Sequence, residues 1–332
     1  ARERVEVAPP GLSRVFFSDN GSTAVEAAIK MAAQFFAQNG EPRRKRFVAL
    51  EGAFHGETVG VASLGGVEVF RKPFAGLLFD CIHVPSPADA NAYEQAFDAL
   101  TRAVKNAASE IAAIVLEPLV QGASGMRIYD ADYLRHARKL CDEHGILLVL
   151  DEVFTGYGRT GRMWATEHAG IEPDILCTAK GFSGGMLPMA ATLVTERVFE
   201  GFLGDKSRAF YYGHSYTGNP LGAAIAREVL RVYRDEKVLE SIAPRARKIR
   251  EAFERMGNFP KVLRTRSLGM IGALDLADEG GYLAPIGWRV AEEARKRGVY
   301  LRPLGNVIYV TPPLNIAESD LDELLGKVEE SV

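Results

Sequence analysis

The chain has 332 residues, of which 47% are hydrophobic and 25% are charged, and its formal net charge is −3. These values are typical of a globular protein with one large domain and a smaller second one. The near-neutral balance argues against a nucleic-acid partner, because phosphate binding needs a concentrated basic face. The only basic run, Arg43-Arg44-Lys45-Arg46, is short and is interpreted as a solvated loop that enters a strand.

The three cysteines, Cys81, Cys141 and Cys177, are an odd number without CxxC spacing. This pattern argues against a disulfide framework and a zinc site and favours a reducing cytoplasm. No apolar run approaches membrane-spanning length, so no membrane partner is expected. No metal is expected either, because the cysteines lack the spacing of a metal site. Residues 1–10 look like the middle of a helix that ends at a Pro-Pro-Gly stop, so the chain is expected to begin partway into a longer protein.

Short apolar runs alternate with helical stretches between residues 14 and 194. Strands are predicted at 15–17, 47–50, 113–116, 146–150, 175–177 and 191–194, and helices at 23–38, 91–109 and 132–144. Because the strand runs are apolar without alternation, they predict a mainly parallel sheet that is covered on both faces, an α/β architecture. Ligands of such sheets bind at the carboxyl ends of the strands.

A long amphipathic helix at 220–235 leads to a second region. Its predicted elements are helices at 238–256 and 286–297, strands at 262–263, 270–276 and 307–311, and a last helix at 319–330. The sequence therefore predicts a large α/β domain over residues 1–235 and a small C-terminal α+β domain over residues 236–332.

Three stretches with possible chemistry follow predicted strands. Asp19-Asn20-Gly21-Ser22-Thr23 precedes a helix, where backbone amides and the helix dipole bind phosphate. The same residue types are good N-caps, and taken alone they favour a simple cap.

The strand at 146–150 ends in Asp151-Glu152, as does the magnesium-binding strand of a P-loop NTPase. That class requires the pattern G-x-x-x-x-G-K-[ST]. The only Gly-Lys pair is Gly326-Lys327, and Val328 follows it, so the NTPase class is excluded. A carboxylate at the end of a buried strand still needs a cationic partner, which a protonated pyridine nitrogen would supply.

Lys180 follows the strand at 175–177, one helix-bearing crossover after Asp151. A lysine at the carboxyl end of a buried strand can lose its proton and attack a carbonyl. The alternative is an ordinary surface lysine at a strand end. If both side chains lie at the same edge of the sheet, they face one crevice.

Six motifs then occur in order: Asn20-Gly21-Ser22-Thr23-Ala24-Val25-Glu26, Phe54-His55-Gly56, Glu117-Pro118, Leu150-Asp151-Glu152-Val153, Gly158-Arg159-Thr160-Gly161 and Ala179-Lys180-Gly181. Together they resemble the class III (ω-type) aminotransferases of the fold-type I enzymes, over residues 11–314. The resemblance implies pyridoxal 5′-phosphate (PLP) as the cofactor. A scaffold protein of this fold would be expected to lack Lys180 or Asp151, and this chain has both.

The resemblance assigns a set of residues to the cofactor. They are Gly21, Ser22, Thr23, Phe54, His55, Gln121, Asp151, Val153, Lys180, His214 and Ser215. It implies that the start of the helix holds the phosphate, that Phe54 and Val153 pack on the two ring faces, and that Gln121 meets the 3′ oxygen. The catalytic residues would be Asp151, which keeps the ring nitrogen protonated, and Lys180, which forms the Schiff base and shuttles the proton.

The substrate residues that the resemblance implies are Phe54, Arg159, Lys180, Gly213, Arg302 and Tyr309. Gly213-His214-Ser215 matches a segment that reaches the partner's phosphate, so a homodimer with shared active sites is implied. Arg159 would meet the amino donor. Arg302 would hold the carboxylate of the keto substrate, which a planar guanidinium grips bidentately. A surface arginine beside a turn is the alternative for Arg302, and a strand-core tyrosine is the alternative for Tyr309.

Within the class, the stretches at 120–126, 210–220 and 301–309 resemble the 7,8-diaminopelargonate synthases of biotin biosynthesis. The expected reaction is amination of 8-amino-7-oxononanoate, with S-adenosylmethionine as donor. A lysine-dependent synthase, or a class III enzyme for another ω-amino acid, a diamine or acetylornithine, stays open. The chain departs from the family in lacking its N-terminal segment, in being short around 87–90, and in having Phe54 for tyrosine and Ser215 for threonine.

Overall fold

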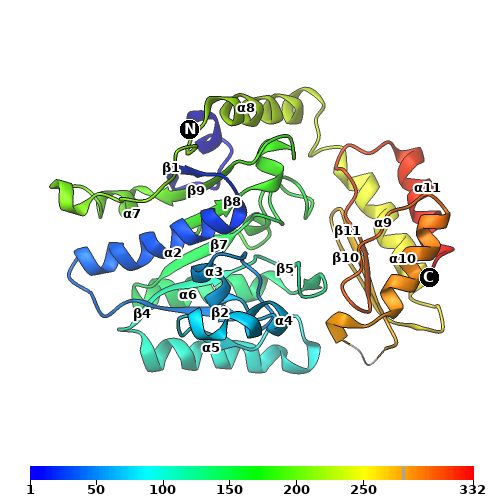
Figure 1. The fold of residues 1–332 in the computed structure, drawn as a ribbon, viewed down its shortest axis with the longest axis horizontal. Helices are drawn as coiled ribbons and strands as arrows, with labels where there is room; N and C mark the ends of the chain where they lie inside the picture. Colours follow the sequence, from blue (N-terminus) through cyan, green and yellow to red (C-terminus); the bar gives the residue numbers. More distant parts are fainter. Residues whose placement is uncertain (279–280) are drawn as a thin grey trace.

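The computed structural model describes residues 1–278 and 281–332. Figure 1 shows a large central sheet with helices on both faces, and a smaller sheet with its own helices beside it. The large sheet has seven strands in the order β1-β9-β8-β7-β4-β2-β3. These are β1 (Leu12–Ser18), β2 (Arg46–Leu50), β3 (Ile82–Val84), β4 (Ile111–Leu116), β7 (Leu147–Asp151), β8 (Ile175–Thr178) and β9 (Ala190–Thr195).

The large sheet is mainly parallel, as predicted. Strands β8, β7, β4, β2 and β3 pair in parallel, whereas β9 is antiparallel to both of its neighbours, β8 and β1. The carboxyl ends of all strands except β9 therefore lie at one edge of the sheet. The sequence did not predict β3, because three partly buried residues are too short to form a recognisable run.

Alternate strand residues face two different helix layers. On β4, Ala113 and Val115 pack with α2 (Gly21–Gln38), whereas Ile114 and Leu116 pack with α5 (Tyr93–Ala107) and α6 (Ala131–His144). This burial on both faces explains why the strand is apolar throughout. The helix α6 ends at Gly145, whose φ of 65° is the left-handed conformation that glycine adopts at helix ends.

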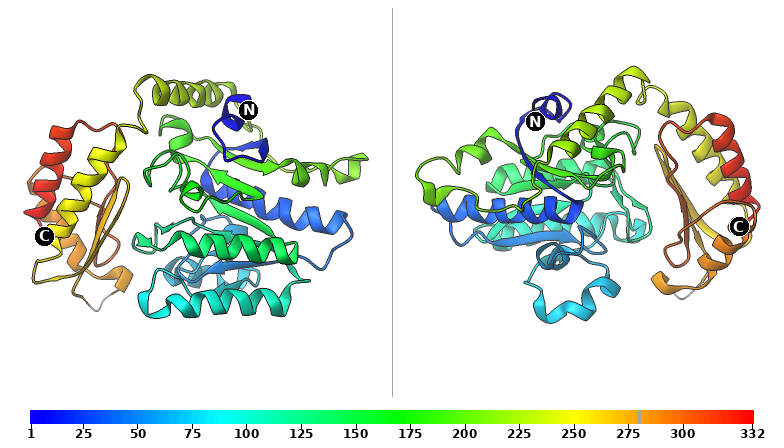
Figure 2. Two further views of the ribbon diagram at one scale, coloured as in Figure 1. Left: turned by 180° about the vertical axis from the view of Figure 1, so that it is seen from behind. Right: turned by 45° about the horizontal axis from the view of Figure 1, so that its top comes forward.

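The helix α8 (Pro220–Asp235) runs along the large sheet toward the small one (Figure 1). Its Ala226 and Leu230 pack with Leu12, Leu176 and Phe182. The helix begins at Pro220 after the N-cap Asn219, whose side chain accepts the Gly222 N–H, so its predicted bounds are confirmed. The N-terminal helix α1 (Arg2–Val5) lies beside α8 in both figures of the ribbon (Figures 1 and 2).

The small sheet is antiparallel, with β10 (Val262–Leu268), β11 (Ile271–Leu276) and β12 (Val307–Val310) in that order. The helices α9 (Ile242–Met256), α10 (Ile286–Lys296) and α11 (Glu318–Glu329) cover its outer face, so that its other face is turned toward the large sheet (Figure 2). On that inner side Ile271, Ala273 and Val307 join the core around β4 and β7. We keep the domain boundary after Asp235 as a proposal, which the end of α8 at that residue supports.

Short elements complete the described part of the chain. They are α3 (Val59–Leu64), α4 (Glu68–Arg71), α7 (Glu196–Glu200), β5 (Val120–Gln121), β6 (Arg127–Ile128) and the 3₁₀ turns η1 (Lys72–Leu77), η2 (Ala90–Ala92), η3 (Ala165–His168), η4 (Lys180–Ser183), η5 (Lys206–Arg208) and η6 (Gly281–Leu283). Over residues 1–278 and 281–332, every helix is too short or too polar to cross a membrane.

Candidate active site

The residues singled out in the sequence meet at the carboxyl edge of the large sheet. Asp151 is the last residue of β7, and Lys180 follows the neighbouring strand β8. Gly21 begins α2 just after β1, His55 lies in the loop after β2, and Glu117 follows β4 directly. The strand order, and not the sequence order, brings these loops together.

Asp151 and His55 form a buried pair. The His55 Nδ1 lies 2.8 Å from Asp151 Oδ2, and Asp151 Oδ1 accepts the Val153 N–H at 3.1 Å. Burial opposes a charge on His55, but the hydrogen bond and the negative charge of Asp151 outweigh it, so that the pKa of His55 is raised. The carboxylate is thus fixed in orientation and keeps lone pairs for a further cationic group.

Lys180 has no hydrogen bond or ion pair with any described residue, although its Nζ lies 5.3 Å from the centre of the Phe154 ring. Lys180 as a whole residue is exposed, but its ammonium group is partly desolvated by the groups around it, and this desolvation lowers its pKa. Asp151 and Glu117 oppose this shift, and the positive charge of Arg159 adds to it. A larger fraction of the amine is therefore neutral than in an ordinary lysine.

The start of α2 presents polar donors. Asn20 caps the helix by accepting the Thr23 N–H at 3.0 Å, whereas the N–H groups of Gly21 and Ser22 donate to none of the described residues. The Ser22 Oγ accepts the Glu57 N–H at 3.1 Å, which leaves its own proton available. Two amides, a hydroxyl and the positive end of an 18-residue helix are groups that could hold a phosphate.

Gly21 also joins this helix start to the end of β7. A Cβ atom at position 21 would lie 2.8 Å from Val153 Cγ1, so only glycine allows the close contact. Val153 therefore lies between the Asp151 carboxylate and the donors of α2. The hydroxyl of Thr23, in contrast, is used within the cap, because it donates to Asp19 Oδ1 at 2.7 Å.

Glu117 is a buried carboxylate whose individual role was not predicted from the sequence. Its Oε2 accepts the Phe54 N–H and its Oε1 accepts the Gly122 N–H, both at 3.0 Å. Desolvation raises the pKa of Glu117 to about 7. The Glu117-Pro118 pair directly after a strand was the signal for this residue, which fixes the loops that carry Phe54 and Gln121.

The Gln121 side chain is held at both ends by protein groups. Its Nε2 donates to the Glu51 carbonyl at 3.0 Å, and its Oε1 accepts the Ser86 hydroxyl at 2.5 Å. Ser86 comes from the loop after β3, a strand too short to be predicted from the sequence. The predicted contact of Gln121 with a 3′ oxygen stays a prediction.

Three aromatic rings extend from the large sheet to the small one. We call Phe54, Phe70 and Tyr282 the aromatic line. The Phe54 and Phe70 rings are 5.4 Å apart at an interplanar angle of 60°, and the Phe70 and Tyr282 rings are also 5.4 Å apart, at 80°. Phe70 and Tyr282 lie in segments without a recognisable motif, so no local pattern indicated them.

Arg302 lies near the far end of the aromatic line. It is exposed and forms no ion pair with any residue of the described ranges. Burial raises the pKa of Tyr282 and of Tyr309, and in both cases the positive charge of Arg302 opposes that shift. The structure thus brings Arg302, Tyr309 and Tyr282 close together, and the predicted substrate contacts of Arg302 and Tyr309 stay predictions.

Arg159 joins the small sheet to the large one. Its Nη1 donates to the carbonyls of Met270, at 3.2 Å, and Pro312, at 2.8 Å. Its Nε and Nη2 donate to no group in the described part of the chain. Desolvation lowers the pKa of Arg159, because its charge has no buried carboxylate beside it. One edge of the guanidinium is therefore free to bind an anion.

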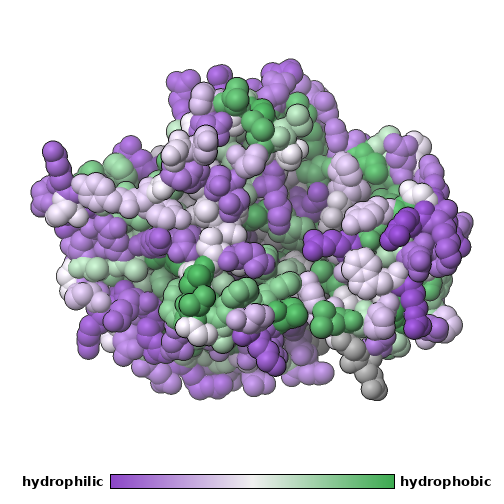
Figure 3. Space-filling model, viewed as in Figure 1, coloured by the Kyte–Doolittle hydropathy of each residue, from purple (hydrophilic) through white to green (hydrophobic). Residues whose placement is uncertain are grey.

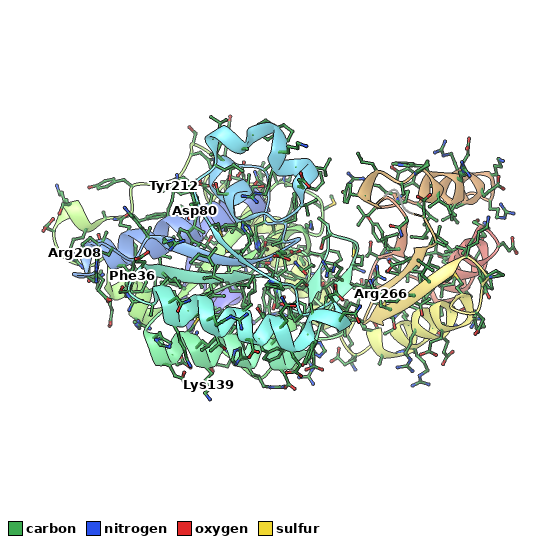
Figure 4. All side chains as sticks on the ribbon, turned by 90° about the horizontal axis from the view of Figure 1, so that it is seen from below. Phe36, Asp80, Lys139, Arg208, Tyr212 and Arg266 are labelled. Carbon is green, nitrogen blue, oxygen red and sulfur yellow. The ribbon has the colours of Figure 1, made fainter. Side chains whose placement is uncertain are left out.

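Arg266 on β10 forms a second joint. Its Nε donates to the Met126 carbonyl at 2.7 Å, its Nη2 donates to the Gly125 carbonyl, and Asp275 pairs with it at 2.7 Å. Figure 4 shows Arg266 on the side of β10 that faces the large sheet. Two arginines from opposite sides of the junction thus hold backbone carbonyls of the other side.

The segment Gly213-His214-Ser215 is exposed. His214 Nε2 lies 3.5 Å from Asp19 Oδ1, so the segment lies close to the start of α2 in the same chain. Tyr211 and Tyr216 beside it are 78% and 75% exposed, which is unusual for aromatic residues. The predicted contact with a partner's phosphate stays a prediction.

Glu152, next to Asp151, points away from the site. It is 1% exposed and accepts the Thr155 hydroxyl at 2.6 Å, the Thr166 N–H at 2.9 Å and the Ala165 N–H at 3.1 Å. Desolvation raises its pKa to about 7. Only the first carboxylate of the Asp151-Glu152 pair belongs to the site.

This raised pKa predicts a pH-dependent stability difference for Glu152→Gln. The folded chain binds the Glu152 proton more tightly than the unfolded chain, so the contribution of Glu152 to stability falls as the pH rises from about 4.5 to 7. Between pH 5 and 8, the free energy of unfolding of Glu152→Gln relative to the parent should rise by up to ~3 kcal/mol. Urea unfolding at both pH values measures it, with the exposed Glu143→Gln as control. A constant difference would contradict the raised pKa.

Comparison with known proteins places these features in context. The family model described as aminotransferase class-III matches residues 1–332. The chain is similar to adenosylmethionine-8-amino-7-oxononanoate aminotransferase from Geobacter sulfurreducens (40% identity, covering 100% of this chain and 77% of that protein). It is similar also to the protein of that name from Nitratidesulfovibrio vulgaris (43% identity, covering 98% and 64%).

Two solved structures are similar as well. The crystal structure of adenosylmethionine-8-amino-7-oxononanoate aminotransferase from Methanocaldococcus jannaschii has a TM-score of 0.94 and 36% identity, covering 99% of this chain and 77% of that chain. A PLP-bound amine transaminase from an uncultivated Pseudomonas species has a TM-score of 0.90 and 35% identity, covering 97% and 77%.

Proposed function

The chain belongs to the class III aminotransferases and is a PLP-dependent transaminase, and from this premise we propose that it aminates 8-amino-7-oxononanoate to 7,8-diaminononanoate in biotin biosynthesis. The names of the relatives that cover most of the chain support this substrate. The observation that carries the proposal is the unpaired Arg302 at the far end of the aromatic line.

The acceptor has an apolar chain between its reacting ketone and its carboxylate. Arg302 would bind the carboxylate, and Phe54, Phe70, Tyr282 and Tyr309 would line the apolar chain. The cation matches the carboxylate of such a molecule, and the aromatic rings match its apolar chain. The absence of an ion-pair partner for Arg302 among the described residues leaves its donors free for the substrate.

The site also fits PLP. The unpartnered amides of Gly21 and Ser22 would hold the phosphate, and Thr23 supports them through the cap. Asp151, fixed by His55, would bind the ring nitrogen, and Val153 and Phe54 would pack on the two ring faces. Gln121 is proposed for the 3′ oxygen. When bound, PLP supplies an electron sink for the carbon–hydrogen bond that must break.

Lys180 would hold PLP covalently and then move the proton. Its lowered pKa increases the neutral fraction of Nζ, which is the form that accepts a proton from the carbon beside the amine. Asp151 and Glu117 limit this shift by favouring the charged form, so the same nitrogen can also return a proton.

We propose S-adenosylmethionine as the amino donor. Its carboxylate would bind the free edge of Arg159, whose Nη1 is already oriented by Met270 and Pro312. Lysine is the alternative donor, because it presents the same carboxylate. A broader amine or ω-amino acid transaminase is the second candidate, which the similarity to the PLP-bound amine transaminase favours.

Single-turnover spectroscopy separates these donors. The PLP-loaded protein is mixed with S-adenosylmethionine or lysine, and the loss of the visible cofactor band is followed. The proposed donor should bleach the band, after which 8-amino-7-oxononanoate should restore it and yield the diamine. Bleaching by lysine alone would reject the proposed donor. Failure of the acceptor to restore the band, with recovery by another keto compound, would reject the proposed reaction.

Arg302→Ala should raise the acceptor KM by a factor that corresponds to the loss of a charge-assisted pair, roughly 1.5–3 kcal/mol or about 10- to 150-fold. The donor half-reaction should change much less, because Arg302 touches only the acceptor. Stopped-flow measurement of each half-reaction tests this. Arg255→Ala, an exposed arginine of α9 that pairs with Glu329, is the control. Equal losses in both half-reactions would show that Arg302 has a structural role.

We further propose a homodimer in the cytoplasm. Exposed apolar side chains support the dimer: Val59, Phe74 and Leu77 are each more than half exposed, and Figure 3 shows apolar residues gathered over α3 and α4. His214 and Ser215, with Gly213, would complete the site of the partner. The three free cysteines support the reducing compartment. Sedimentation equilibrium of the PLP-loaded protein tests the dimer, and a fully active monomer would contradict it.

A further inference from the structure

Arg4 is a buried cation with no acid beside it. The residue is only 5% exposed, and it has no salt bridge within residues 1–278 and 281–332. The carboxylate of its neighbour Glu3 pairs instead with Arg227 on α8, at 2.7 Å. Desolvation lowers the pKa of Arg4. A buried guanidinium is unfavourable unless its donors are satisfied, so the groups that satisfy it indicate what it does.

All the acceptors of Arg4 are neutral and lie far away in the sequence. Its Nη1 donates to the Tyr157 hydroxyl at 2.6 Å, and its Nη2 donates to the Phe182 carbonyl at 2.8 Å and to the Ala226 carbonyl. The Arg4 Cζ also lies 4.2 Å from the centre of the Phe182 ring. One side chain thus joins α8, the loop after β7 and the turn η4.

The turn η4 begins with Lys180. Phe182, whose carbonyl and ring both contact Arg4, follows Lys180 by two positions in this same turn. On its other side the turn packs tightly on Tyr157, because a Cβ atom at Gly181 would lie 2.7 Å from Tyr157 Cβ. Tyr157 is itself fixed, since its carbonyl accepts the Tyr233 hydroxyl at 2.7 Å. Arg4 and its partner Tyr157 therefore enclose the turn that carries Lys180.

The backbone of this turn is strained. Lys180 has a φ of 41° and Tyr157 has a φ of 57°, both in the left-handed region that non-glycine residues avoid. Such conformations persist only where the surrounding contacts enforce them. Arg4 donates one hydrogen bond to Tyr157, which is itself a strained residue. It donates another to Phe182, which lies two residues after the strained Lys180.

We propose that Arg4 is a positioning residue that holds Lys180 in its productive conformation through the Phe182 carbonyl and the Tyr157 hydroxyl. This inference rests on the proposed role of Lys180, but not on the identity of the substrates. Arg4 is distant from the reacting atoms and acts only through the turn. It also reaches the loop that continues to Arg159, so one side chain supports both the lysine and the proposed donor site.

The test compares PLP-loaded Arg4→Met, Arg4→Lys and the control Arg227→Met. The control removes the link from α8 to Glu3 but leaves η4 untouched. The first measurement is the pH midpoint of the visible band of the Lys180-bound cofactor. In Arg4→Met the loosened turn exposes the lysine nitrogen to more water than in the parent, so the midpoint should rise, because desolvation no longer lowers it as strongly. Arg4→Lys, which keeps one donor, should lie between this variant and the parent.

The second measurement is steady-state kinetics. Misplacement of the lysine should lower kcat about tenfold in Arg4→Met, with much smaller changes in KM, because the substrate contacts remain. Arg227→Met should retain the midpoint and the kcat of the parent. A parent-like midpoint and kcat in Arg4→Met, even with a lower melting temperature, would show that Arg4 only attaches the N-terminal helix and would overturn the proposal.

Tyr157→Phe keeps the proposal testable if Arg4→Met does not fold. It removes only the hydroxyl that accepts from Arg4 and retains the ring that packs on Gly181. A smaller rise of the midpoint is expected, and an unchanged midpoint would count against the proposal. The spectral test needs no substrate. A shifted midpoint without conversion of 8-amino-7-oxononanoate would therefore reject the proposed function alone, and conversion with an unshifted midpoint would reject this inference alone.

Discussion

Lys180→Ala is expected to abolish transamination, with kcat reduced by roughly 10⁴-fold or more, because both the covalent attachment of PLP and the proton transfer depend on its Nζ. PLP should still bind noncovalently, because the donors of Gly21 and Ser22 and the carboxylate of Asp151 remain. In the parent, borohydride reduction followed by peptide mapping should find the cofactor on Lys180.

Lys139→Ala serves as the control for this prediction. Lys139 lies on the outer face of α6, far from the carboxyl edge of the sheet, and its side chain is 72% exposed (Figure 4). It should retain the absorbance and turnover of the parent. Reduced cofactor on another lysine, or appreciable turnover of Lys180→Ala, would reject the assignment of Lys180.

Asp151→Asn is expected to bind PLP but to lose at least about a hundredfold in kcat, because a neutral amide does not stabilise a positive ring nitrogen in a buried site. His55 would also lose its charged partner. Since the negative charge of Asp151 raises the pKa of His55, that histidine should become neutral at lower pH in the variant. Rates of the two half-reactions should fall together, because both use the same ring.

Asp174→Asn is the control that distinguishes a catalytic role of a buried aspartate from a role in packing. Asp174 is also a buried aspartate at a strand end, but it precedes β8 and accepts the Leu148 N–H and an Arg138 hydrogen bond, both at 2.8 Å. The Asp174→Asn variant should be less stable than the parent, while its folded form keeps the turnover of the parent. An Asp151→Asn enzyme within a few-fold of the parent rate would show that Asp151 only packs.

The elements that the sequence predicted best are those with a strong local pattern. The strand β4 is apolar throughout and β7 is apolar up to its last residue, Asp151, and both were predicted; α8 was predicted with its observed bounds. The strand β10 was predicted over two residues only, because Arg264, Thr265 and Arg266 are polar. Their side chains are at most partly buried and two of them make ion pairs at the junction of the two sheets.

The residues of the candidate site were likewise predicted only where a local sequence pattern indicated them. Asp151, Lys180 and Gly21 were found because each lies at the end of a strand or within three residues after it, where a parallel sheet collects its ligands. The pairing of His55 with Asp151 and the contact of Arg4 with Phe182 join residues 96 and 178 positions apart. Such contacts depend on the strand order, which no local pattern encodes. The aromatic rings of Phe70 and Tyr282 were missed for the same reason.

Arg159 and Arg266 join the two sheets through contacts that substitutions at the acceptor positions do not remove. Arg159 and Arg266 bind carbonyl oxygens of Met270, Pro312, Gly125 and Met126, which every amino acid supplies. Mutations at those four positions leave the acceptor atoms in place, so the spacing between Lys180 and Arg302 is inherited with the backbone. The rings that line the gap are side chains, so a substitution there changes their size without removing those carbonyl acceptors. Single substitutions among these rings can therefore change the width and polarity of the gap between Lys180 and Arg302. The residues that would bind the two ends of the substrate keep their positions.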